Sequence, residues 1–81
     1  MEMTINMTYI VMEIQANDLN TAVVPPITYT NLYEAESKFH QILASAAVSA
    51  VEEHTAVLLT SGGQVLRTEC YHHILEENEE T

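Results

Sequence analysis

The stretch Asn31–Ser49, NLYEAESKFHQILASAAVS, decides the fold, because it is the longest segment with the period of an amphipathic helix. Asn31 is a residue type that caps helix N-termini, and Glu34 follows at the position that a capping box requires. Apolar side chains at helical spacing predict the face that meets the core: Ala35, Phe39, Ile42, Leu43, Ala46 and Ala47. We therefore predict a helix over 31–49 that packs through Phe39 and its neighbours.

The segment before the helix begins with a strand-like stretch, Thr8–Gln15, in which the side chains alternate as in a half-buried strand. One face carries Ile10, Met12 and Ile14, and we expect this face to meet the core. The opposite face carries Tyr9, Val11, Glu13 and Gln15 and is expected to point away from the helix.

A second strand, Thr21–Thr30, follows a turn that Asn17 and Asp18 favour. Pro25 and Pro26 interrupt this strand. Neither proline can donate a hydrogen bond to a sheet ladder, and prolines also discourage pairing between sheet edges. The sequence therefore predicts that this strand lies at an edge of the sheet.

Two further strands are predicted after the helix, over Thr55–Thr60 and Val65–Tyr71. They are separated by a short linker with Gly62–Gly63 at its centre, which is typical of a hairpin turn because such turns need positive φ angles. Ser61-Gly62-Gly63 does not form a phosphate-binding loop, since the lysine and the following helix are missing.

The predicted order is ββαββ, and the fold class is α+β in two layers. A four-stranded antiparallel sheet in the order 2-1-3-4 carries the helix packed on one face, which leaves the other face solvated or against a partner. We expect 1–7 to be a disordered leader, 8–73 to be a single α+β domain, and 74–81 to be an acidic tail.

The charge of the chain is strongly unbalanced. Among 81 residues there are 12 acids and only two bases, Lys38 and Arg67, which gives a formal net charge of −10. Binding to nucleic acid or to an anionic membrane depends on several lysines and arginines, so neither partner is expected. With a single cysteine, no transmembrane run and no basic N-terminal region, the chain is expected to be cytoplasmic.

Candidate chemical groups gather near the end of the last strand. Cys70, His72 and His73 are residue types that bind zinc, and His40 or His54 could join them in space. The paired Cys-x₂-Cys spacing of zinc sites is absent, and on a strand His73 points away from the other two. We therefore expect no metal and no cofactor.

No arrangement of residues predicts an enzyme. Cys70 has no Gly-rich oxyanion loop or helix N-terminus after it, which a nucleophilic cysteine needs.

Tyrosine is enriched at protein interfaces, and three side chains are candidates for an interface on the sheet face away from the core: Tyr9, Val11 and Tyr71.

Three segments carry a resemblance to a known group of proteins: YIVMEIQ (Tyr9–Gln15), the helix with its following strand (Glu34–Thr60), and GQVLRTECYHH (Gly63–His73). Together they resemble a family of small uncharacterised proteins of Gram-positive gut bacteria and their phages or mobile elements. The family has no assigned activity or functional residues, so the resemblance implies only an accessory role in a phage-like setting. The two prolines and the acidic tail depart from its pattern.

The leading hypothesis for function is a non-enzymatic protein–protein interaction module that is homo-oligomeric or binds another protein. A core this small contributes roughly 3–5 kcal/mol of net stability, which makes burial of a second apolar surface favourable. Two alternatives remain. One is a small-ligand or metal-binding protein that uses Cys70, His72 and His73. The other is an acidic inhibitor that mimics nucleic acid in the basic groove of an enzyme.

Overall fold

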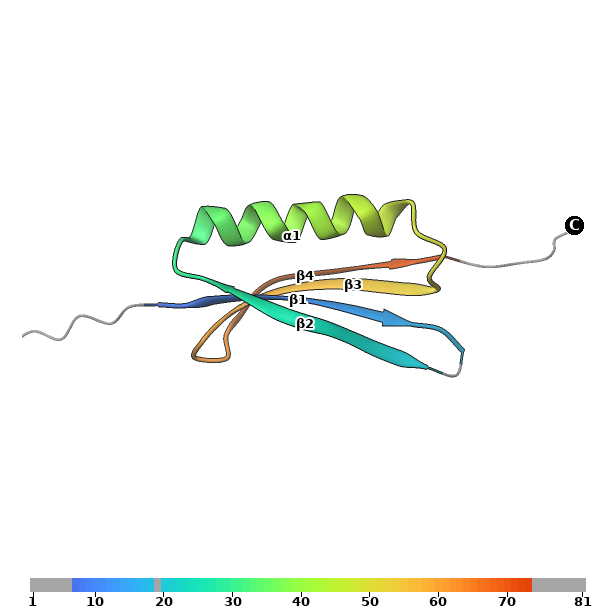
Figure 1. The fold of residues 1–81 in the computed structure, drawn as a ribbon, viewed down its shortest axis with the longest axis horizontal. Coiled ribbons are helices and arrows are strands. Elements are labelled where there is room, and N and C mark those ends of the chain that lie inside the picture. Colours follow the sequence, from blue (N-terminus) through green and yellow to red (C-terminus); the bar gives the residue numbers. More distant parts are fainter. Residues whose placement is uncertain (1–6, 19, 74–81) are drawn as a thin grey trace, which may run out of the picture.

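The computed structural model describes residues 7–18 and 20–73, and this part of the chain contains four strands and one helix (Figure 1). They are β1 (Tyr9–Ala16), β2 (Thr21–Tyr29), α1 (Leu32–Ala47), β3 (Glu53–Thr60) and β4 (Val65–His72). All strand pairs are antiparallel in the order β2-β1-β3-β4, and α1 lies along one face of the sheet. The predicted fold class and strand order are confirmed. The predicted leader, except Met7, and the predicted tail lie outside the described residues.

The predicted helix is confirmed, together with its cap. The side chain of Asn31 accepts hydrogen bonds from the backbone N–H groups of Tyr33 (2.8 Å) and Glu34 (3.1 Å), which satisfies two donors that the first turn leaves open. The buried face consists of Ala35, Phe39, Ile42 and Ala46. Of the other two residues predicted for this face, Leu43 is partly buried and Ala47 is exposed. Within the described residues, no helix is both long and apolar enough to cross a membrane.

The prediction of which face of β1 meets the core is wrong. Val11 is only 2% exposed and belongs to the core cluster, and Tyr9 packs against that cluster. Ile10, Met12 and Ile14 alternate with these residues and therefore lie on the sheet face that α1 does not cover.

The physical reason for this error is that alternation separates two faces of a strand without saying which one the helix covers. Both β2 and β3 run antiparallel to β1, so they are parallel to each other and α1 forms a crossover between them. Such crossovers are right-handed in almost all proteins, and this handedness decides the side on which the helix lies. The uncovered side of β1 carries Ile10, Met12 and Ile14, whereas the covered side includes Glu13 and Gln15, so hydropathy favoured the wrong side.

The core between α1 and the sheet is small. Among the described residues, the buried hydrophobic side chains are Val11, Ala35, Phe39, Ile42, Ala46, Ala56 and Leu58. Three of these seven are alanines, which let α1 approach the sheet closely but contribute little buried area. The larger side chains Phe39, Leu58, Val11 and Ile42 therefore supply most of the apolar burial.

The two edges of the sheet differ. β2 is an edge strand, as predicted, and its register with β1 shifts between the pair Val11–Ile27 and the pair Glu13–Val24. Pro25 and Pro26 both lie in this shift, so the ladder is interrupted where they cannot donate. β4 forms the other edge and has no proline.

The turn between β3 and β4 agrees with its prediction. The N–H of Thr60 donates to the carbonyl of Gln64 (2.9 Å), and Gly63 has a φ of 92°. Residues other than glycine adopt this left-handed conformation only rarely, so Gly63 fits the turn and fixes the start of β4.

Candidate functional site

The three candidate metal ligands are not brought together. Cys70 and His72 lie on the sheet face that α1 does not cover, where His72 Nδ1 is 3.7 Å from Glu53 Oε2. His73 turns toward the helix, and its Nε2 donates to the backbone carbonyl of Ala46 (2.8 Å). In the part of the chain that the structure describes, no group of three or more His, Cys, Asp or Glu side chains could hold a metal ion.

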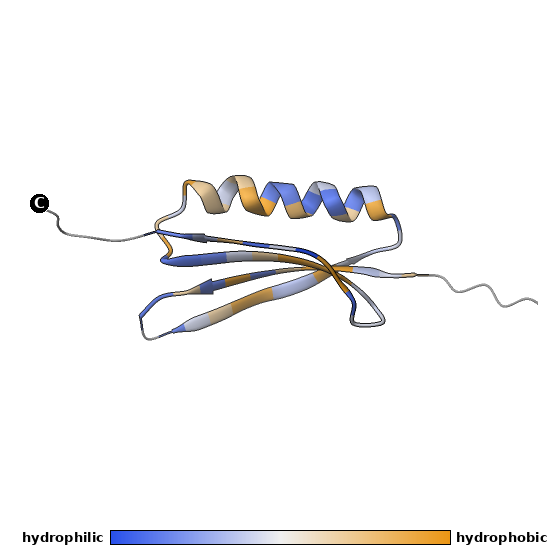
Figure 2. Cartoon of the chain, turned by 180° about the vertical axis from the view of Figure 1, so that it is seen from behind, coloured by the Kyte–Doolittle hydropathy of each residue, from blue (hydrophilic) through white to orange (hydrophobic). Residues whose placement is uncertain are grey.

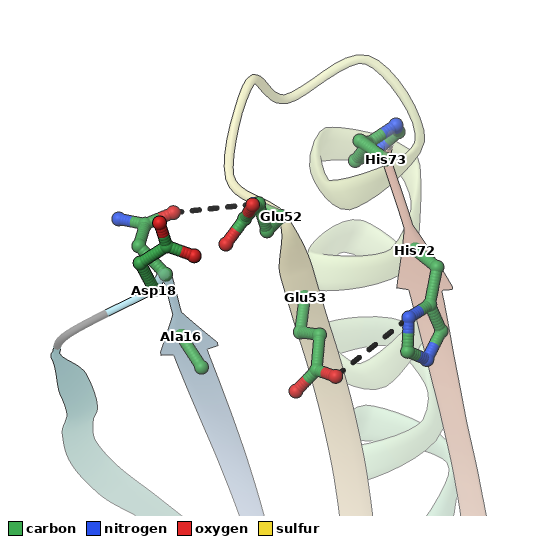
Figure 3. A pocket seen from close by; sticks show the side chains of 7 residues that line it. Ala16, Asp18, Glu52, Glu53, His72 and His73 are labelled. Carbon is green, nitrogen blue, oxygen red and sulfur yellow. Dashed lines mark hydrogen bonds and ion pairs between the residues drawn. The ribbon is translucent and has the colours of Figure 1, made fainter. Parts of the chain in front are cut away.

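A hollow of 510 Å³ lies at one end of the sheet, beside the start of β3 and the end of β4 (Figure 3). Its lining consists of Ala16, Asn17, Asp18, Glu52, Glu53, His72 and His73. The side chain of Asn17, just after β1, links to the residue before β3: its Oδ1 accepts a hydrogen bond from the backbone N–H of Glu52 (3.2 Å).

This hollow has few of the properties of a ligand-binding pocket. Such pockets are mostly apolar, with a few polar groups that fix the orientation of the ligand. Here Asp18 and Glu53 are exposed and Glu52 is partly exposed. The two histidines contact Glu53 and the end of α1. The arrangement is that of a solvated polar strand end, so it supports no class of small ligand.

A partly buried chain of hydrogen bonds joins β1, β3 and the loop after α1. His54 is 4% exposed, and its Nε2 is 2.5 Å from Glu13 Oε2. Its Nδ1 is 3.0 Å from Ser49 Oγ, which also accepts a hydrogen bond from the N–H of Val51 (2.9 Å). Gln15 Nε2 donates to the same carboxylate oxygen at 3.0 Å.

The electrostatics of this group favour an ionised Glu13. Burial by itself would raise the pKa of Glu13, because it removes water from the carboxylate. The hydrogen bonds from His54 and Gln15 and the charges of His54 and Lys38 have the opposite effect, and the pKa of Glu13 lies below its usual value. The Glu13 carboxylate is therefore held as an acceptor for both of its donors.

Serine, histidine and glutamate are also the residue types of a hydrolytic triad. A triad needs oxyanion donors and room for a substrate beside the hydroxyl group. The hollow in Figure 3 is lined by neither Ser49, His54 nor Glu13, and Ser49 Oγ is occupied by the N–H of Val51. The geometry supports a structural role, in which the group fixes the loop after α1 to the sheet.

Sequence reasoning missed this group. It began the third strand at Thr55, which left His54 outside the sheet, and it placed Glu13 on the face away from the core. In the structure β3 begins at Glu53, and His54 lies opposite Gln15 in the ladder with β1. A continuous alternation from His54 through Ala56 and Leu58 is the signal that could have placed His54 on the buried face.

The three candidate interface residues lie on the face that α1 partly covers. Val11 is buried in the core and has no surface for a partner, so its assignment to an interface is corrected. Tyr9 is partly buried against the same core. Tyr71 is 40% exposed, and its ring stacks on His73 with centroids 6.1 Å apart. These residues do not form one exposed patch.

An apolar surface does lie on the sheet face opposite α1, which is here called the uncovered face. Its residues on the central strands are Ile10, Met12 and Ile14 from β1 and Thr55, Val57 and Leu59 from β3. Val23 and Val65 extend it onto the outer strands, with 52% and 54% exposure. Figure 2 shows apolar residues along much of β1 and β3, whereas the ends of these strands near Ala16 and Glu53 are polar.

No family model, curated protein or solved structure matches the chain.

Proposed function

We propose that the domain is a non-enzymatic protein–protein interaction module and that the uncovered face of the sheet is its binding surface. The observation that supports this proposal is the distribution of charge. Among the described residues, the six positions of this face on β1 and β3 from Ile10 to Ile14 and from Thr55 to Leu59 include no charged side chain. The face that α1 covers, in contrast, includes Glu13 and His54.

An antiparallel sheet with one solvated face usually alternates between apolar and polar residues. This sheet does not, because the face exposed to water is at least as apolar as the face beneath the helix. Large contiguous apolar patches on the surface of a domain mark interaction sites. Burial of the uncovered face would also add a second apolar layer to a domain whose own core is small.

The size of the face suggests the kind of complex. Four strands about 4.8 Å apart, with about eight residues each rising about 3.3 Å, give a footprint of roughly 500 Å². A standard stable interface buries about 800 Å² on each partner, so this face fits a small, reversible interface. A partner with an apolar centre and a basic rim would complement the net charge of −10.

A single substitution tests the proposal. Met12 lies at the centre of the uncovered face, so Met12→Glu should place a charge in the interface and reduce the partner recovered by at least about tenfold. Tagged chains are cross-linked in cells that carry the gene, and the recovered partner is quantified for each tagged chain. Gln41→Glu, on the exposed side of α1, makes the same change in charge and should leave recovery unchanged.

Two outcomes would contradict the proposal. One is that Met12→Glu and Gln41→Glu recover equal amounts of partner while both retain the melting curve of the wild type. The other is that the wild-type chain cross-links to no partner and sediments as a monomer at about 100 µM.

A further inference from the structure

Within the described residues, the outer edge of β4 pairs with no further strand, and the proposed function does not use this edge. The opposite edge strand, β2, is protected by Pro25 and Pro26, which interrupt its ladder. β4 has no proline, and all of its residues are exposed. An edge strand of this kind presents backbone N–H and C=O groups that can pair with a further strand.

The ladder between β3 and β4 shows which backbone groups are available. The N–H of His73 donates to the carbonyl of Glu52 (2.7 Å), so the backbone of His73 faces β3. In an antiparallel ladder, successive residues face opposite sides, and the register here is regular from Arg67 onward. The backbone groups that face the free edge are therefore those of Thr68, Cys70 and His72.

We propose that a second copy of the chain adds to this edge, so that the two β4 strands pair antiparallel about a two-fold axis through Thr68. Two identical antiparallel strands in one sheet are related by an axis perpendicular to the sheet. Such an axis passes between the same residue of both copies, and the choice of that residue fixes every other pair. Only a few centres are possible within β4.

Charge selects Thr68 among these centres. With Thr68 opposite itself, Arg67 of each copy lies opposite Glu69 of the other, and two opposite-charge pairs form. With Arg67 or Glu69 at the centre, two like charges lie opposite each other. With Cys70 at the centre, Arg67 lies opposite His73 and Glu69 opposite Tyr71, so neither charge finds its complement.

The geometry of the edge agrees with this register. Because the backbone of Thr68 faces outward, Thr68 and its copy form a hydrogen-bonded pair. The pairs between Arg67 and Glu69 are then non-hydrogen-bonded pairs, in which side chains approach most closely. Arg67 Nε is 3.6 Å from Glu36 Oε2, and the Arg67 side chain is 51% exposed. Its terminal nitrogens can therefore reach a second carboxylate.

This self-association uses an edge rather than the uncovered face, so it is independent of the proposed function. The axis is perpendicular to the sheet, and both copies therefore keep their helices on the same side. The two uncovered faces would lie side by side on one continuous sheet of twice the width. A partner of the proposed module would then meet a doubled apolar surface.

Complementary substitutions test the register. Arg67→Glu places a carboxylate opposite Glu69 of the other copy, and Glu69→Arg places a guanidinium opposite Arg67. Each variant alone should therefore dimerise at least about tenfold more weakly than the wild type. An equimolar mixture of the two variants places unlike charges opposite each other and should restore the dimer, as should the double variant. Sedimentation equilibrium in buffer of low ionic strength measures all five samples.

Matched controls separate this effect from changes in net charge and fold. Glu34→Arg changes the net charge as Glu69→Arg does, but Glu34 lies on α1, so the dimer should persist. Met12→Glu should also remain dimeric. Thermal melting shows which variants fold; if Arg67→Glu does not, the decisive comparison is that of wild type with Glu69→Arg and Glu34→Arg.

Several results would overturn the proposal. These are a wild-type chain that stays monomeric at about 100 µM, single variants that dimerise like the wild type, or a mixture that remains monomeric. A dimer that is lost in Met12→Glu and kept in both charge variants would place self-association on the uncovered face. That result would overturn the edge register while leaving the proposed function standing.

Discussion

Phe39 is the side chain on which the stability of the domain depends most. It is 2% exposed, and several of its neighbours in the core are alanines that cannot fill the space it occupies. Phe39→Ala should therefore lower the free energy of unfolding by about 3–5 kcal/mol, the usual cost of truncating a buried phenylalanine. Urea denaturation measures the change, and for a domain of this size the variant should be largely unfolded without urea.

Gln41→Ala is the control for this prediction, because Gln41 lies on the exposed side of the same helix. Its effect should stay within about 0.5 kcal/mol. A cooperative transition of Phe39→Ala at nearly the wild-type urea concentration would show that Phe39 is not a core residue.

The pairing of Glu13 with His54 should make stability depend on pH in acid. The folded state lowers the pKa of Glu13 below the ordinary value of 4.5, so the ionised carboxylate stabilises the fold. This contribution is complete above that value and is lost as the pH falls through the lower pKa of the folded state. Glu13→Gln should be about 1–2 kcal/mol less stable than the wild type at pH 7.

Urea denaturation of both chains from pH 7 to pH 3 tests this dependence. The difference in unfolding free energy between wild type and Glu13→Gln should shrink below about pH 4.5, the ordinary pKa of the carboxyl group. A difference that stays constant over the whole range would show that Glu13 acts through packing and not through its charge.

At the scale of elements, the sequence was sufficient where one local signal acted alone. Asn31 marked the start of α1, Pro25 and Pro26 placed β2 at an edge, and Gly62–Gly63 marked the hairpin. Each of these signals depends on a residue and its near neighbours. Local physics of this kind is independent of how distant segments pack.

The sequence was insufficient where two elements had to be placed relative to each other. The core-facing side of β1 depends on the handedness of the crossover through α1, so alternation alone gave the wrong face for Val11 and Met12. The same error hid the pairing of Glu13 with His54, which are 41 residues apart in sequence. It also led to the choice of interface candidates that lie on the covered face in the structure, where Val11 is buried and Tyr9 packs against the core.

The candidate surfaces were predictable only in part, for a related reason. An unpaired second sheet face followed from one helix and four strands, but its residues followed only from the register of β1 with β3. The complementary pair Arg67 and Glu69 is visible in the sequence as two charges on one strand. These two charges can pair across a dimer only because β4 is an edge strand without proline, and the position of β4 follows from the strand order of the sheet.

At the scale of the whole molecule, charge opposes folding. The chain has 12 acids and two bases, and one of the bases, Arg67, already lies beside Glu36. Unbalanced like charges repel one another more strongly in the compact state than in the unfolded chain. This repulsion extends over about 30 Å at 0.01 M salt and about 8 Å at 0.15 M salt, so salt should relieve most of it.

The free energy of unfolding should therefore rise by about 1 kcal/mol when NaCl is increased from about 0.01 M to about 0.15 M. Urea denaturation at a concentration where the chain sediments as a monomer measures this rise. Replacing Glu76, Glu77, Glu79 and Glu80 by glutamine changes the net charge from −10 to −10 + 4 = −6 and should reduce the rise. If added salt instead lowers stability, the prediction is wrong. Salt would then be screening a net attraction, and the pairs Glu13–His54 and Arg67–Glu36 would outweigh the repulsion among the acids.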